Sequence, residues 1–235
     1  MNAVLTTLAF AIAAGAAAAG NAPADNAPAG DDGWRPLFNG EDLSGWRANL
    51  DPDAFAVEDG LLRVRATGPK RAHLFYVGDA GNGEGNGDGD FERFRNFELE
   101  AVVRAEPNSN SGIFFHTDRT LRDAKGHLAT GYELQLNSSA RERRKTGSLY
   151  AVVDLDRSPV DETNWFVVRL AVRDRRITVA LDGETVVDYT EPENVERPAS
   201  RAGRRLSPEG GAIALQAHDP DSVWSFRSIK VRPLP

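Results

Sequence analysis

One short segment of the chain carries an unusual set of polar side chains for a β-strand. In TGYELQLNSS (residues 130–139), alternate positions place one carboxylate and two amides on the side opposite three apolar residues. These polar side chains are Glu133, Gln135 and Asn137. A carboxylate can exchange a proton and amides can both donate and accept hydrogen bonds, and no Lys or Arg lies among them. The pattern therefore indicates a face that binds or transforms a polar ligand.

Three further segments repeat this chemistry, and they read SGIFFHT, GSLYAVV and GAIALQAH. Alternation predicts that each presents polar or aromatic side chains opposite a buried apolar face. The side chains in question are Phe114, His116, Tyr150, Gln216 and His218. If the four strands are neighbours, they form a concave surface of hydrogen-bonding groups and aromatic platforms. Such a surface suits a sugar, whose hydroxyls need donors and acceptors and whose C–H face stacks on a ring.

The elements that must position these side chains are strands. AFAVEDGLLRVRA and ITVALDGETVVDY each read as strand, Asp-Gly turn, strand, with the turns at Asp59–Gly60 and Asp182–Gly183. About a dozen strands follow from the alternation, and only residues 38–46 and 191–208 could hold a short helix. This spacing predicts an all-β fold, a two-sheet antiparallel jelly-roll sandwich.

Other strands show an ordinary solvated face. In WFVVRLAVR and the segment that follows, the residues opposite the apolar positions include Arg169, Arg173 and Arg176. The short basic runs at residues 140–145 and 201–205 are interpreted as solvated loops rather than polyanion sites. A net charge of −7 and a pI near 5.2 argue against a nucleic-acid partner, which requires basic surface. The sequence has no cysteine, which excludes disulfides, thiolate metal sites and a thiol nucleophile.

The first residues are predicted to lie outside the folded domain. Residues 1–20 are apolar and Ala-rich and indicate a signal peptide, and residues 21–32 indicate a disordered linker. The domain is expected to cover residues 33–235, with a periplasmic or secreted location and no membrane span after signal removal. The Gly-rich insert Gly78 to Asp90 is predicted to be a mobile surface loop, with calcium ligation as the alternative.

The chain also resembles a known family, the 3-keto-disaccharide hydrolase domain family, from Trp34 to Leu234. The resemblance rests on segments that occur in the order and spacing of that family: WRPLFNGEDLSGW, FELEAVVRAEPNSNSGIFFHT, GYELQLN, KTGSLY, NWFVVRLAV, LDGETVVD and ALQAHDPDSVWSFRSIKVRPL. It implies a concanavalin-A-like jelly roll and export from the cell. It further implies action on glycosides whose C3 hydroxyl is oxidised to a ketone.

A 3-keto glycoside allows cleavage by elimination. The ketone acidifies the C2 proton, so a base can remove it and expel the aglycone from C1, after which water adds. Glu133 is the predicted base, because burial at the centre of the face would raise its pKa toward working pH. His116 and His218 are the predicted proton donors or enolate stabilisers. Ordinary two-carboxylate hydrolysis is disfavoured, because the E-x-D-x-x-E strand of jelly-roll glucanases is missing.

The remaining candidate site residues have binding roles. Asp219 could orient an imidazole or hold a metal, and Lys145 and Tyr150 could reach the ketone oxygen. The others are Phe114, Gln135 and Gln216. No cofactor is expected to be required; a divalent metal is possible, although no local ligand spacing such as H-x-x-x-H supports it. The expected partner is a small glycoside or oligosaccharide oxidised at C3. The alternatives are a non-catalytic lectin-like module and a structural envelope domain.

Overall fold

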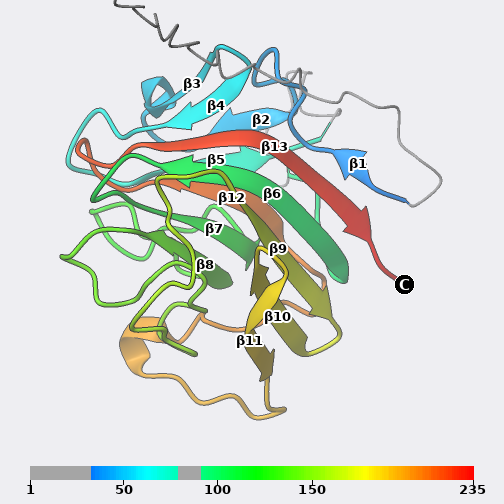
Figure 1. The fold of residues 1–235 in the computed structure, drawn as a ribbon. Coiled ribbons are helices and arrows are strands. Elements are labelled where there is room, and N and C mark those ends of the chain that lie inside the picture. Colours follow the sequence, from blue (N-terminus) through cyan, green and yellow to red (C-terminus); the bar gives the residue numbers. More distant parts are fainter. Residues whose placement is uncertain (1–32, 79–90) are drawn as a thin grey trace, which may run out of the picture.

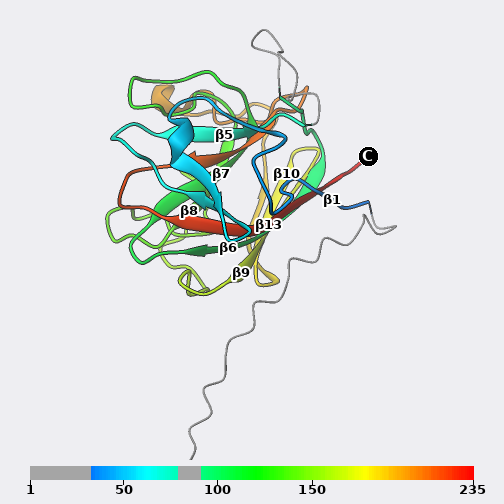
Figure 2. The ribbon, with the colours of Figure 1, turned by 90° about the horizontal axis from the view of Figure 1, so that it is seen from above.

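Two antiparallel β-sheets face each other in the computed structural model, which describes residues 33–78 and 91–235 (Figure 1). The view from above separates the two layers, with β6, β9 and β13 on one side and β5 and β7 on the other (Figure 2). The all-β, two-sheet antiparallel fold predicted from the alternation is therefore confirmed. The predicted signal peptide (1–20), the linker (21–32) and residues 79–90 of the insert lie outside the described residues.

Sheet A is the larger sheet, and its strands pair antiparallel in one continuous ladder. In order they are β11 (Glu184–Thr190), β10 (Arg176–Leu181), β9 (Phe166–Arg173), β6 (Phe97–Ala105), β13 (Trp224–Pro233), β4 (Leu61–Val64) and β3 (Phe55–Glu58), with β1 (Arg35–Pro36) also on β13. Both Asp-Gly hairpins form as predicted. Asp59 and Gly60 have φ values of 52° and 74°, and Asp182 and Gly183 have values of 47° and 87°, as a type I′ turn requires.

Sheet B is smaller and holds the polar strands. In order they are β2 (Trp46–Ala48), β5 (Ala72–Tyr76), β12 (Ala212–Ala217), β7 (Asn110–Thr117) and β8 (Tyr132–Asn137). Three of the four segments singled out for their polar residues, β12, β7 and β8, are thus neighbours. The only helices among the described residues are single 3₁₀ turns, Pro52–Ala54 and Ala199–Arg201, and the second falls in the expected connection.

The fourth polar segment is not a strand, so that prediction is wrong. Residues 147–150 do lie along the edge of β8. There the backbone N–H of Gln135 donates to the Ser148 carbonyl and the backbone N–H of Tyr150 donates to the Glu133 carbonyl, each at 2.9 Å. The chain then reverses at Ala151, which has a φ of 60°, and Leu149 bridges back to Val153. A tight turn therefore replaces the second half of the expected strand.

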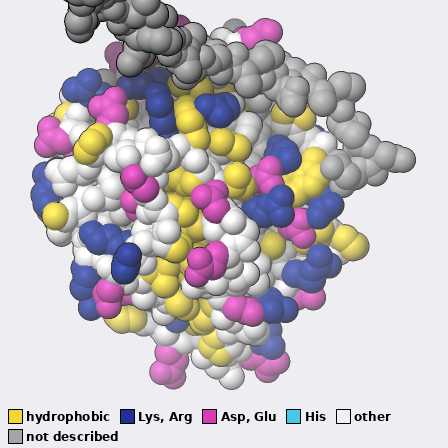
Figure 3. Space-filling model, in the orientation of Figure 1, with side chains coloured by type: hydrophobic (Ala, Val, Ile, Leu, Met, Phe, Trp, Pro, Cys, Tyr) yellow, Lys and Arg dark blue, Asp and Glu magenta, His cyan; other side chains and the backbone are white. Residues whose placement is uncertain are grey.

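The main core lies between the sheets, and strict alternation supplies it. In β6 every second residue is buried, from Phe97 through Leu99 to Ala105, and the residues between are partly exposed. Burial of such apolar surface is the dominant favourable term in folding. The outer face of sheet A is the ordinary solvated face that was predicted, because Glu100 pairs there with Arg169 and Lys230. Acidic and basic side chains are interspersed on the side of the molecule shown in Figure 3.

Sheet B differs because its three polar strands are buried on both faces. Every residue of β7, β8 and β12 is buried. A second apolar cluster covers part of the outer face, and its members are Phe75, Val77, Phe91, Phe114, Leu128, Ala212 and Ala214. The open concave surface expected from the sequence is thus closed over by connecting segments. No helix among the described residues is long and apolar enough to cross a membrane.

His73 on β5 is part of this covered face, and it should make the fold sensitive to acid. Its side chain is fully buried, its ring lies edge-on to Phe114 at 5.0 Å, and Nδ1 has no hydrogen-bond partner. Burial lowers the pKa of His73 to about 3. As the pH falls below about 6.5, the His73 imidazole binds a proton in the unfolded chain but stays neutral in the folded protein. Acid therefore favours the unfolded state.

We predict that His73 alone lowers the unfolding free energy by about 1.4 kcal/mol for each unit by which the pH falls from 6 to 4. His73→Leu cannot titrate, so its unfolding free energy should fall less steeply with acidity than that of the wild type. Urea denaturation of both proteins across this range measures the difference in slope. Parallel pH dependences of the two proteins would contradict the prediction.

Candidate active site on sheet B

Glu133 lies at the centre of the covered face because of its neighbours in the ladder. In the register of β7 and β8, Phe114 pairs with Glu133 and Gly112 pairs with Gln135. A Cβ atom on Gly112 would lie 2.9 Å from Glu133 Oε1 and 3.1 Å from its Cγ. Only glycine leaves room there, so the Glu133 side chain lies across β7 rather than standing away from the sheet.

A guanidinium from a distant connection meets this carboxylate. Arg204 Nη2 donates to Glu133 Oε2 at 2.9 Å, and both side chains are 7% exposed. The guanidinium also lies 5.3 Å from the centre of the Phe114 ring. Burial raises the pKa of the Glu133 carboxyl above its ordinary value, although the Arg204, Arg201 and Arg71 charges oppose this. The result is a buried ion pair with a carboxylate whose affinity for a proton is increased.

The connection that carries Arg204 lies directly on the loop before β8. A Cβ atom on Gly203 would come within 2.0 Å of the Ala129 carbonyl oxygen, so glycine is needed for this close approach. Arg201 from the same connection stacks on Tyr150 at 4.8 Å. The interpretation of residues 201–205 as a solvated loop is therefore wrong for Arg201 and Arg204, because both point onto the covered face.

An imidazole lies just beyond the end of β12. His218 Nδ1 is 2.7 Å from Asp219 Oδ2, and His218 Nε2 is 2.8 Å from Arg71 Nη2. Since a guanidinium only donates, Nε2 accepts and the proton lies on Nδ1, facing Asp219. Burial and then the Arg71 charge lower the pKa of His218, although Asp219 opposes them. His218 is thus neutral near pH 7 and carries its lone pair on Nε2.

A second imidazole has the same kind of partner. His127 Nδ1 lies 2.8 Å from both carboxylate oxygens of Asp123. The loop that holds them is fixed to the entry of β5, because Arg71 donates its backbone N–H to the Lys125 carbonyl at 3.0 Å. Burial lowers the pKa of His127 even with Asp123 beside it. Two neutral, carboxylate-oriented imidazoles therefore border the same face.

These groups line one pocket of about 90 Å³. Its residues are Arg71, Asn110, Phe114, Arg122, His127, Leu128, Glu133, Gln135, Glu142, Tyr150, Arg201, Arg204, Gln216 and His218. Gln135 Nε2 donates to Asn110 Oδ1 at 3.0 Å, whereas the Oε1 atoms of Gln135 and Gln216 are buried and accept no hydrogen bond. A buried polar atom without a partner is costly. Two such acceptors in one pocket indicate a ligand that brings donors.

Comparison with known proteins places the chain in a family. The sequence profile of the 3-keto-alpha-glucoside-1,2-lyase-like domain matches residues 33–232, nearly the whole described chain. The chain belongs to this family. The resemblance stated from the sequence motifs is thereby confirmed.

Individual relatives agree with this assignment. A 3-keto-disaccharide hydrolase of Bacteroides thetaiotaomicron is 26% identical over 242 residues, which cover 86% of this chain and 79% of that protein. A Parabacteroides distasonis protein, provisionally described as a glycosyl hydrolase, superposes with a TM-score of 0.67 at 21% identity, covering 86% of this chain and 94% of that one. A Bacillus subtilis protein with a galectin-like fold gives 0.56 at 15% identity, covering 85% and 94%. The two structures support the sandwich fold.

Within this 3-keto-lyase-like domain, the structure brings most of the predicted site residues together. The pocket is lined by Phe114, Glu133, Gln135, Tyr150, Gln216 and His218. Asp219 lies behind His218 and orients its ring, as one of its two predicted roles required. Phe114 is 2% exposed and its ring contacts His73 and Arg204, so it borders the pocket without offering an open stacking face.

His116 does not lie on the covered face, so its predicted place there is wrong. Its φ of 53° marks a β-bulge, where the register between β7 and β12 shifts. The ring instead stacks near Phe97 of sheet A, Nε2 contacts the Arg95 carbonyl at 2.8 Å, and Nδ1 accepts from Ser207 N–H at 3.1 Å. Both nitrogens are thus committed to backbone groups, which makes His116 a structural residue.

Lys145 does not reach the pocket either, and the prediction that it does is wrong. Its Nζ donates to the Ser139 and Glu142 carbonyls, which holds the loop after β8 closed. That loop contributes Glu142 instead, whose Oε2 accepts from the Tyr150 hydroxyl at 3.1 Å. Glu142 carries no periodic signal in the sequence, because it lies outside the strands.

All but one of the missed pocket residues come from connections, and the exception, Asn110, lies on β7. They are Arg71, Asn110, Arg122, His127, Leu128, Glu142, Arg201 and Arg204. Periodicity assigns faces only within strands, so all of these except Asn110 carried no such signal. The spacing of Asp123 and His127 offered a local clue, because the imidazole follows the carboxylate by four positions.

The pocket offers no metal-ligand set. No group of three or more His, Asp or Glu side chains within residues 33–78 and 91–235 lies close enough to hold an ion. His218 illustrates the reason, since Asp219 occupies its Nδ1 and a cationic guanidinium faces its Nε2. A metal requirement was left open by the sequence and stays a prediction to be tested.

We predict that Arg204→Met destabilises the protein by roughly 3–5 kcal/mol at pH 8, because it leaves the Glu133 carboxylate buried without its cation. The loss should shrink as the pH falls, because burial already raises the pKa of Glu133 and the loss of the opposing Arg204 charge raises it further, so that the buried carboxyl takes up a proton. Glu133→Gln combined with Arg204→Met should recover part of the loss, as urea denaturation would show.

Arg173→Met serves as the control, because Arg173 is 60% exposed on sheet A and its nearest carboxylate, that of Glu98, is 4.0 Å away. Its stability should stay within about 0.5 kcal/mol of wild type. Equal stability of Arg204→Met and Arg173→Met would show that the buried pair does not hold the covered face together.

Proposed function

We propose that the protein cleaves 3-keto glycosides by elimination and hydration. Membership of the 3-keto-alpha-glucoside-1,2-lyase-like family and the name of the Bacteroides relative support this substrate class. The observation that carries the proposal is the position of Glu133, a buried carboxylate with a raised pKa beside two amide oxygens that lack donors. Sugar hydroxyls on the substrate would supply those donors.

Glu133 acts first, as the general base. The C2–H bond breaks, the proton passes to the carboxylate, and the electron pair forms the enolate with O3 of the ketone. Burial favours this transfer because it raises the proton affinity of the carboxyl. The Arg204 guanidinium, which already pairs with Glu133, stabilises the negative charge as it moves from the carboxylate to O3.

The same carboxyl then completes the elimination. The enolate re-forms the ketone, the C1–O bond breaks, and the leaving oxygen takes the proton from Glu133, which returns to its charged state. Water then adds to C1 of the enone. His218 Nε2 takes a proton from that water as its oxygen bonds to C1, and the electron pair of the C1–C2 double bond moves to O3. His218 then gives this proton to C2 and becomes neutral again, so the sum is one glycoside and one water giving a 3-keto sugar and a free aglycone.

The proposed location follows from the first residues of the chain. The apolar segment 1–20 and the polar segment 21–32 support export to the periplasm or outside the cell. A non-catalytic lectin-like module is the second candidate. The ion pair between Glu133 and Arg204 favours this second candidate, because a carboxylate that stays paired with a guanidinium does not act as a base.

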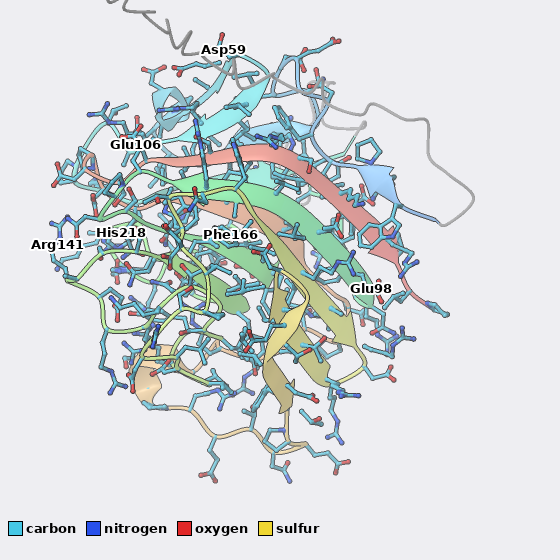
Figure 4. All side chains as sticks on the ribbon, in the orientation of Figure 1. Asp59, Glu98, Glu106, Arg141, Phe166 and His218 are labelled. Atoms are coloured by element: carbon cyan, nitrogen blue, oxygen red, sulfur yellow. The ribbon has the colours of Figure 1, made fainter. Side chains whose placement is uncertain are left out.

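We predict that Glu133→Gln binds a 3-keto glucoside but cleaves it at least about 100-fold more slowly, because the amide keeps the shape and removes the base. Release of a chromogenic aglycone measures the rate, and calorimetry measures binding. Glu98→Gln is the matched control, since Glu98 lies on the far side of the molecule from His218 (Figure 4). Turnover of Glu133→Gln equal to that of the control would remove Glu133 from the mechanism, and binding without turnover by the wild type would establish the lectin.

We further predict that Asp219→Asn lowers kcat by roughly 10²–10⁴-fold, because His218 loses the acceptor that keeps its proton on Nδ1. The acid limb of the kcat/KM profile should also move, since Asp219 opposes the downward shift of the His218 pKa; without it that limb lies at lower pH. Asp221→Asn is the control, because its side chain is 77% exposed. A change in melting temperature with an unchanged pH profile would reduce Asp219 to a structural role.

A further inference from the structure

Two of the four pocket guanidiniums have no acidic partner among the described residues. Arg204 pairs with Glu133 at 2.9 Å and Arg122 pairs with Asp123 at 3.2 Å. Arg71 and Arg201 line the same pocket, yet neither has a carboxylate oxygen within 4.0 Å in the described part of the chain. This positive charge is local, because the whole chain has a net charge of −7.

The partners that these two side chains do have are neutral. Arg71 Nη2 donates to the lone pair of His218 Nε2 at 2.8 Å. The Arg201 guanidinium stacks over the Tyr150 ring at 4.8 Å, and the nearby Glu142 carboxylate is already engaged by Arg144 and by the Tyr150 hydroxyl. Most of the five N–H donors of each guanidinium therefore remain available to a ligand.

The proposed reaction on a neutral sugar does not account for this charge. Proton transfer from C2 to Glu133 moves one negative charge from the carboxylate to O3 and leaves the charge of the pocket unchanged. Hydration likewise leaves it unchanged, because the positive charge gained by His218 is balanced by the enolate that forms when the water oxygen adds to C1. Both guanidiniums lie close enough to lower the pKa of Glu133, so with a neutral substrate they would weaken the base that the reaction needs.

We propose that the natural substrate carries a permanent anionic group, a carboxylate, sulfate or phosphate, that Arg71 and Arg201 bind. This inference rests on the proposed function and names the class of glycoside that the same pocket takes. Guanidinium groups suit such anions because their planar forks bind two oxygens at once. The buried Oε1 atoms of Gln135 and Gln216 bind the hydroxyls of the same sugar.

Anion binding also changes the base beside it. Arg71 occupies His218 Nε2 while the pocket holds no anion. An anionic group that takes over this guanidinium removes the donor from Nε2 and weakens the positive field at Glu133. Binding of an anionic substrate thereby frees His218 Nε2 to accept a proton and increases the basicity of the Glu133 carboxylate.

A pair of substrates that share one aglycone tests the inference. We expect kcat/KM for a 3-keto glucuronide to exceed that for the 3-keto glucoside by at least about tenfold, which corresponds to about 1.4 kcal/mol, and the ratio to fall as salt is added. Glucoside 6-sulfate and 6-phosphate analogues, oxidised at C3, distinguish the three anions. Arg201→Gln and Arg71→Gln should each bring the ratio toward one, whereas Arg173→Gln on sheet A should leave it unchanged.

Binding of unoxidised sugars separates this inference from the proposed function. Methyl glucuronide should bind the wild-type protein about tenfold more tightly than methyl glucoside by calorimetry, and Arg201→Gln should abolish the difference. Cleavage of the keto glucoside with a ratio of one or less overturns the inference and leaves the function standing. Absence of any turnover with preferential glucuronide binding overturns the function and supports the inference, and equal binding of both sugars in that case overturns both.

Discussion

The covered face of sheet B depends on the buried pair between Glu133 and Arg204. A buried carboxylate cannot remain charged without a compensating group, and burial of either member alone is strongly unfavourable. The pair joins a strand to a connection that lies 71 residues further along the chain. It therefore ties the chemistry of the face to the path of the connection above it, and both must form together.

The two sheets differ in how they meet solvent. Sheet A keeps one face in solvent, where pairs such as Glu100 with Arg169 contribute little. Sheet B buries both faces of β7, β8 and β12, so the polar side chains at its outer face depend on partners from neighbouring strands and loops. His218 finds Asp219 and Arg71, and His127 finds Asp123. The contacts of His218 fix its tautomer, with the proton on Nδ1 and the lone pair on Nε2.

The sequence predicts those features that are local. Alternation and the Asp-Gly turns predict the sandwich and both hairpins, and the same alternation assigns Glu133, Gln135 and Gln216 to one face. Alternation fails where the backbone departs from ideal geometry without a local sequence signature. His116 turns away from the covered face at a bulge, and Ala151 reverses the chain after Tyr150. It also fails for Arg71, Arg201 and Arg204, because a pairing over a long separation leaves no periodic trace in the residues themselves. A basic run such as RAGRR has the same sequence whether its arginine side chains are solvated by water or paired with a buried carboxylate.

The close approach at Gly203 has a consequence for how such domains diversify. The connection rests on the Ala129 backbone and lies outside the strands of both sheets, so its positions other than Gly203 and Arg204 can change without altering the sandwich beneath. Glu133, Gln135 and Gln216 lie on strands, whereas Arg71, Arg201 and Arg204 lie on connections. Substitutions in those connections could thus change which glycoside is accepted, while the carboxylate and the amides on the strands keep their places.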